Sequence, residues 1–148
     1  MKTAIVYYSQ HHGNTKKLLD AIAECGDVTL FDITKGMPDS LEEYDIIGFA
    51  SGIYFQKFKD TVLKCAKEKL PKGKKVFLIY TYGAKRDGQT KGMKAIIEEK
   101  ECTFLGEYGS FGFDTFGPFK LIGGIAKGRP NEEDIAGAVE FYKKICTM

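Results

Sequence analysis

Apolar runs of strand length alternate with helical patterns along nearly the whole chain. The apolar runs fall near residues 2–8, 28–32, 45–50, 75–81 and 102–109, and the helical patterns near 14–25, 56–69, 90–100 and 131–146. Neighbouring parallel strands need a long crossover connection, which is usually a helix. The alternation therefore predicts an α/β fold with a five-stranded parallel sheet and helices on both faces. It is compatible with the strand order 2-1-3-4-5, whose switch point lies between the first and third strands.

Length and composition indicate one ordinary globular unit. The chain has 148 residues, of which 43% are hydrophobic and 28% charged, and we expect a single domain over residues 1–148. The longest apolar runs are too short to cross a bilayer, and the N-terminus shows no signal pattern. We therefore predict no membrane insertion and a cytoplasmic location.

Cysteine spacing and charge distribution exclude some classes of site. The four cysteines lie roughly forty residues apart without a Cys-x-x-Cys pair, which predicts reduced thiols and no metal centre. The net charge is only +2, but residues 57–75 carry eight lysines against two acids. This block could attract an anionic partner or nucleic acid. We favour a solvated helix face, and predict no nucleic-acid partner.

The loop after the first strand has the residues of a phosphate site. Ser9 and Thr15 supply hydroxyl donors, and Gly13 and Asn14 stand where the turn opens a helix, whose N-terminus favours an anion. The spacing differs from that of a nucleotide P-loop and from that of a dinucleotide fingerprint. His11 and His12 could donate to a phosphate dianion, or could be exposed without a role.

Two further loops are expected at the same edge of the sheet, because the carboxyl ends of parallel strands lie together. Residues 51–57 carry Ser51 and Gly52, then Ile53, Tyr54 and Phe55, and residues 81–88 begin with Thr81, Tyr82 and Gly83. A flat aromatic ligand needs a ring to stack on and backbone groups at its rim. Tyr54 is the first candidate for stacking and Phe55 the second, whereas Phe58 is expected to dock the following helix.

The first loop resembles the FMN-phosphate loop of flavodoxins, commonly Ser/Thr-x-Thr-Gly-x-Thr, although His11-His12 makes it one residue longer. The segments 51–55 and 112–134 resemble the same family, and the likeness covers essentially the whole chain. It implies a flavodoxin-like three-layer α/β/α sandwich that binds FMN noncovalently and passes electrons between redox partner proteins. The cofactor contacts that it implies are Ser9, His11, His12, Gly13, Asn14, Thr15, Ser51, Gly52, Ile53, Tyr54, Phe55, Thr81, Tyr82 and Gly83.

Departures from the usual carriers leave alternatives open. Those carriers are strongly acidic around the flavin and often place glycine after the stacking residue, whereas here Tyr54 is followed by Phe55-Gln56 and a lysine-rich helix. An FMN-dependent oxidoreductase, resembling a quinone reductase or a menaquinone-linked protoporphyrinogen oxidase, is the main alternative. A flavin-free interaction module is the third. The apolar segment 111–125 is expected to be covered, and the candidates are the domain's own sheet, the flavin edge, a partner protein or an apolar substrate such as a quinone.

Two other activities found on similar folds are excluded by the residues at the strand ends and in the first loop. A response regulator needs acidic residues after the first and third strands, but these ends read Tyr7-Tyr8-Ser9 and Ala50-Ser51. A low-molecular-weight tyrosine phosphatase needs a cysteine in the first loop, and that loop has none.

Overall fold

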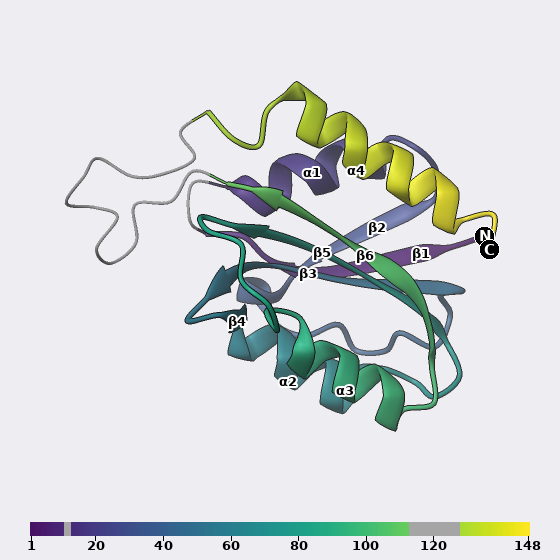
Figure 1. The fold of residues 1–148 in the computed structure, drawn as a ribbon. Coiled ribbons are helices and arrows are strands. Elements are labelled where there is room, and N and C mark those ends of the chain that lie inside the picture. The colour runs from purple at the N-terminus through teal and green to yellow at the C-terminus, as the bar shows by residue number, and fades with distance from the viewer. Residues whose placement is uncertain (11–12, 113–127) are drawn as a thin grey trace.

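A computed structural model describes residues 1–10, 13–112 and 128–148 of the chain. Its sheet has five parallel strands in the order β2-β1-β3-β5-β6, with a short sixth strand, β4, paired antiparallel to β3 (Figure 1). The strands are β1 (Thr3–Tyr8), β2 (Val28–Asp32), β3 (Ile46–Tyr54), β4 (Lys57–Phe58), β5 (Lys75–Tyr82) and β6 (Thr103–Phe111). The predicted five-stranded order is confirmed, and β4 is an addition to it.

Among the described residues, four α-helices cover the two faces of this sheet (Figure 1). One face carries α1 (Asn14–Ala23) and α4 (Glu132–Ile145), and the other carries α2 (Asp60–Lys69) and α3 (Lys91–Glu99). A single 3₁₀ turn, η1 (Ile33–Lys35), follows β2. The three-layer α/β/α sandwich expected from the sequence is therefore confirmed.

The central strands are apolar on both faces because helices bury both. In β1, Ala4 and Val6 belong to the core on the α2/α3 side, while Ile5 belongs to the core under α1 and α4. This is why the strands read as continuous apolar runs instead of alternating patterns. Phe58, expected to dock the following helix, is buried in the first of these cores together with Val62 of α2.

The expected helix over 56–69 and the expected third strand over 45–50 need correction. β3 continues to Tyr54, since the chain turns back and β4 pairs with it through Ile53 opposite Phe58 and Tyr54 opposite Lys57. Helix α2 consequently begins only at Asp60. Residues 51–54, which we expected in a loop, are thus the end of a strand.

The strand register places four carboxyl ends at one edge of the sheet. Tyr8 lies opposite Ser51, Gly52 opposite Thr81, and Thr81 opposite Ser110. The ends of β1, β3, β5 and β6 therefore meet there, beside the N-terminus of α1 (Figure 1). Among the residues that the structure describes, no helix is long and apolar enough to cross a membrane.

Candidate functional site

A narrow cavity opens between these four strand ends and the start of α1. We call it the neutral cavity. Its lining residues are Ser9, Asn14, Thr15, Gly52, Ile53, Tyr54, Thr81, Tyr82, Gly83 and Gly112. All of them except Gly112 are among the contacts expected from the sequence. Whether they touch a flavin stays a prediction.

The first wall is the start of α1. Gly13 is the N-cap residue and adopts a left-handed φ of 64°, a conformation that glycine reaches without steric cost. Ser9 Oγ accepts a hydrogen bond of 3.0 Å from the backbone N–H of Lys16. The Ser9 hydroxyl hydrogen is not used in that bond, and no acidic residue stands in the first turn of α1. This wall therefore offers donors and the positive end of a helix dipole.

A buried pair of hydroxyls joins this wall to β5. Thr15 Oγ1 and Thr81 Oγ1 lie 2.9 Å apart, and both residues are almost fully buried. Only one hydrogen is shared between the two oxygens, so the other hydroxyl keeps a hydrogen that can be donated elsewhere. The pair thus leaves a second hydroxyl donor beside that of Ser9.

Gly112 closes the cavity against the same helix. Its backbone N–H donates to Tyr82 O at 2.9 Å, which extends the pairing of β6 with β5 by one residue. A Cβ at Gly112 would lie 2.6 Å from Nδ2 of Asn14, so only glycine fits here without moving its neighbour. Sequence reasoning missed Gly112 because it ended the last strand at residue 109, although a glycine directly after an apolar strand was the available signal.

The second wall is formed by the end of β3. The ring of Tyr54 folds back over Gly52, where an added Cβ would come within 3.3 Å of it. Tyr54 also meets Tyr8 edge to face, with ring centroids 5.7 Å apart. The ammonium of Lys59 lies 4.9 Å from the centroid of Tyr8 and 5.5 Å from that of Tyr54. A cation therefore stands directly beside the residue expected to stack on a flavin.

Phe55 and Gln56 form the two-residue turn between β3 and β4. Both have a positive φ, 51° and 65°. Positive φ at both central residues is typical of a type I′ turn, whose twist matches that of a hairpin and whose central residues are usually Asn or Gly. Gln89 Nε2 donates to Gln56 Oε1 at 3.2 Å and to Ala84 O at 3.1 Å, which ties the turn to the loop after β5. Phe55 is 79% exposed and does not line the neutral cavity.

Ser51 also stays outside the lining of the cavity. It is fully buried, and its Oγ accepts from the backbone N–H of Lys59 at 3.1 Å while donating to Gly52 O. Its side chain therefore anchors the hairpin. The predictions for His11, His12 and the apolar segment concern residues that lie outside the described part of the chain, except at residues 111 and 112.

The third wall is Tyr82 at the end of β5. Tyr82 is only 7% exposed and packs edge to face on Phe111, with centroids 4.9 Å apart. Burial raises the pKa of its phenol, so Tyr82 is neutral at ordinary pH. Tyr82 therefore lines the cavity with an uncharged side chain.

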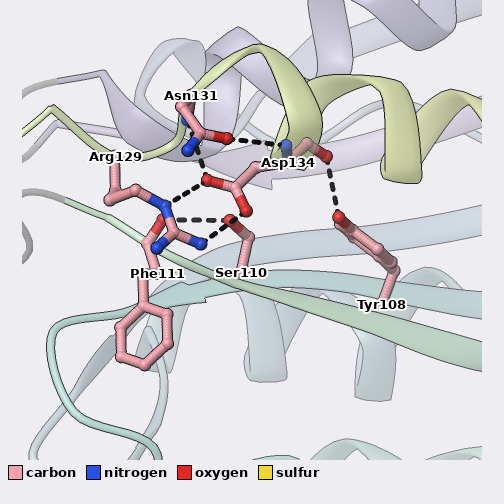
Figure 2. A network of polar contacts seen from close by, with 6 residues as sticks. All are labelled: Tyr108, Ser110, Phe111, Arg129, Asn131 and Asp134. Atoms are coloured by element: carbon pink, nitrogen blue, oxygen red, sulfur yellow. Dashed lines mark hydrogen bonds and ion pairs between the residues drawn. The ribbon is translucent and has the colours of Figure 1, made fainter.

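A polar network holds Phe111 and the entry to α4 together (Figure 2). Arg129 donates two parallel hydrogen bonds to the Asp134 carboxylate, the Nη2–Oδ1 bond being 2.6 Å, and its guanidinium lies 5.1 Å from the Phe111 ring centroid. Asn131 and Asp134 cap α4 reciprocally. The bonds from Arg129 lower the pKa of Asp134 although its partial burial opposes this. The role of Arg129 was not predicted from the sequence, because it depends on the position of Phe111.

A second network supports the loop after β5. Glu107 accepts hydrogen bonds from Tyr80 at 3.2 Å and from Thr90 at 3.1 Å, and pairs with Lys94 at 2.8 Å. Burial, together with the neighbouring Glu107 carboxylate, raises the pKa of Tyr80 to about 12. These bonds join β5 and β6 to the start of α3, and so fix the C-terminal end of the loop that follows β5.

The donor set of the neutral cavity fits a phosphate joined to a flat ring. The cavity has unused hydroxyl hydrogens at Ser9 and in the Thr15–Thr81 pair, a helix N-terminus, and aromatic side chains at Tyr54 and Tyr82. None of the described residues that line it is a carboxylate, which would repel a phosphate. The site therefore fits FMN in the chemistry of its donors.

Comparison with known proteins identifies the family. A family model described as a flavodoxin domain matches residues 5–108. The chain belongs to this flavodoxin-domain family. An uncharacterised protein of Methanocaldococcus jannaschii is 40% identical over 147 residues, which cover 98% of each chain.

Solved structures agree in fold with this flavodoxin-domain protein. A Fusobacterium nucleatum flavodoxin bound to flavin mononucleotide has a TM-score of 0.69 at 16% identity, covering 99% of this chain and 98% of that one. An NADPH-quinone reductase from P. pentosaceus has a TM-score of 0.66 at 11% identity, covering 97% of this chain and 96% of that one. At these identities the likeness concerns the fold alone.

Proposed function

We propose that this chain binds FMN noncovalently in the neutral cavity and carries electrons between redox partner proteins. One observation carries the proposal. Hydroxyl donors at Ser9 and in the Thr15–Thr81 pair, the N-terminus of α1, and the aromatic side chains of Tyr54 and Tyr82 line one and the same cavity. This combination suits a ligand with a phosphate at one end and an aromatic ring at the other.

Each part of the cavity has a role in this proposal. Ser9, Thr15 and the start of α1 would hold the phosphate, and Tyr54 and Tyr82 would flank the ring, with the backbone of Gly52 and Gly83 at its rim. FMN supplies the electron transfer, while the protein holds the ring, tunes its environment and limits access to it. None of the described residues that line the cavity is charged, and Tyr82 is neutral at ordinary pH, so proton chemistry by these side chains is not part of the proposal.

Membership of the flavodoxin-domain family supports the proposal, and so does the fold shared with a flavodoxin bound to flavin mononucleotide. The proposed redox partners are two proteins: one that donates electrons to the carrier and one that accepts them. A cytoplasmic location is part of the same proposal.

The second candidate is an FMN-dependent oxidoreductase. A second cavity, lined by aromatic rings and lysines, shares Tyr54 with the neutral cavity and could admit a small substrate. Turnover of a quinone with NAD(P)H, or of protoporphyrinogen with a quinone, by the FMN-loaded protein would favour an enzyme. Reduction by NAD(P)H alone without turnover of either substrate would favour the carrier.

The test is to incubate the purified protein with FMN or riboflavin, desalt it, and record the visible spectrum. The proposal predicts that one FMN per chain is retained and released on denaturation, whereas riboflavin, which lacks the phosphate, is lost on the column. A colourless protein after incubation with FMN would refute flavin binding.

A further inference from the structure

A second cavity lies between the end of β1 and the β3–β4 hairpin and shares Tyr54 with the neutral cavity. We call it the hairpin cavity. Its volume is about 260 Å³, and its lining includes Tyr8, Tyr54, Phe55, Lys57, Lys59 and Asp60. Pockets for drug-sized ligands measure roughly 300–1,000 Å³, so this space suits a smaller molecule of one or two fused rings.

The aromatic walls of the hairpin cavity are held in place by the surrounding fold. Tyr8 and Tyr54 pack edge to face at an interplanar angle of 82°, and Phe55 belongs to the tight turn that follows Tyr54. The hydrogen bond from Gln89 to Gln56 fixes the tip of that turn, and Ser51 fixes its base through the backbone of Lys59. The cavity is therefore largely preformed, which lowers the ordering cost of binding.

The two lysines of the cavity differ in their partners. Lys57 Nζ forms an ion pair of 2.9 Å with Asp60. Lys59 pairs with no carboxylate among the described residues, and its ammonium instead faces the rings of Tyr8 and Tyr54. Lys59 is also only half-exposed. A partly desolvated ammonium beside aromatic walls attracts a ligand that has both a negative charge and an aromatic ring.

We propose that the hairpin cavity binds a small planar aromatic anion, with its ionised oxygen on Lys59 and its ring against Tyr8, Tyr54 and Phe55. A hydroxyquinone or an aromatic carboxylate has this chemistry. Binding stands on the cavity alone, whereas electron exchange with such a ligand rests on the proposed flavin, because Tyr54 lines both cavities.

The test is calorimetric titration of the purified chain, with and without FMN, using two ligands of similar size. Lawsone is a hydroxynaphthoquinone that is an anion at neutral pH, and menadione is its neutral methyl counterpart. Lawsone is expected to bind at least about tenfold more tightly, because only the anion forms an ion pair with Lys59. Its affinity should also fall as salt is added, whereas that of menadione should not.

Variants locate the site. K59M should remove most of the preference for lawsone, K59R should retain it, and K64M, at an exposed lysine of α2, should leave it unchanged. Thermal melting of each variant checks that it is folded. Equal binding of the two ligands, or a preference that survives K59M, would overturn the proposal. Lawsone binding without FMN binding would refute only the proposed function, and FMN binding without lawsone binding would refute only this inference.

Discussion

The two cavities that meet at Tyr54 differ in how they would hold a negative charge. The neutral cavity offers hydroxyl hydrogens and a helix N-terminus, and none of the described residues lining it is charged. The hairpin cavity, in contrast, places the Lys59 ammonium against aromatic faces. A fixed set of neutral dipoles can bind a phosphate tightly without placing a cation next to it. The Lys59 ammonium beside Tyr54, in contrast, would stabilise negative charge on the ring of the proposed flavin.

The largest effect is expected from T15V, which removes one hydroxyl of the buried pair. On the proposed function the pair donates its spare hydrogen to the phosphate, and a hydrogen bond to a charged group contributes about 1.5–3 kcal/mol, or roughly 10–150-fold in affinity. Flavin fluorescence quenching would measure the dissociation constant for FMN. Because Thr15 and Thr81 act as a pair, T81V and the double variant should resemble T15V. Additive losses would contradict a shared role.

The second effect concerns the network in Figure 2, which supports Phe111 behind the neutral cavity. D134N removes the charge-assisted bonds to Arg129 and weakens the cap of α4, so the free energy of unfolding should fall by about 1–2 kcal/mol. Urea denaturation at neutral pH measures it. S40A, at an exposed serine away from both cavities, is the control.

The same network predicts a pH dependence. Because the folded pKa of Asp134 is lowered, its contribution is fully present above the pKa of an unfolded aspartate, about 3.9, and is lost as the pH falls through the folded value. The stability difference between wild type and D134N should therefore be constant near neutrality and shrink in acid. A difference that grows in acid would show that the Arg129 contact is wrong.

The sequence was sufficient for the parallel strands and for most of the residues that line the neutral cavity. Apolar runs predicted all five parallel strands. Ser9, Tyr54 and Tyr82 follow from their positions at strand ends, and Thr15 from its position at the start of a helix. The short strand β4 was missed because two residues carry no periodicity. Tertiary contacts decide the remaining features: Gly112 matters through Asn14, and Arg129 through Phe111 and Asp134.

A smaller effect is expected on the reduction potential of the bound flavin. K59M removes the cation nearest Tyr54, so negative charge on the reduced flavin is less stabilised and the reduction potential should become more negative. A shift on the order of 20–40 mV corresponds to about 1 kcal/mol of lost charge interaction. Potentiometric titration of the FMN-loaded protein measures it, with K64M as the matched control. An unchanged potential would show that the hairpin cation does not act on the flavin.

The smallest effect on FMN binding is expected from S51A. Its hydroxyl serves the backbone of Lys59 and does not line the neutral cavity, so the affinity for FMN should change less than about threefold. Stability should nevertheless fall by about 1 kcal/mol, because a backbone N–H loses its acceptor. A large loss of FMN affinity with unchanged stability would assign the Ser51 side chain to the cofactor.

The most direct measurement is the ratio of dissociation constants for riboflavin and FMN, obtained by fluorescence quenching under the same conditions. If neutral donors at Ser9, Thr15 and the start of α1 hold the phosphate, FMN should bind at least about a hundredfold more tightly than riboflavin, and T15V should reduce that ratio. Equal binding of the two ligands, or a ratio that T15V leaves unchanged, would contradict the assignment of the neutral cavity to the phosphate.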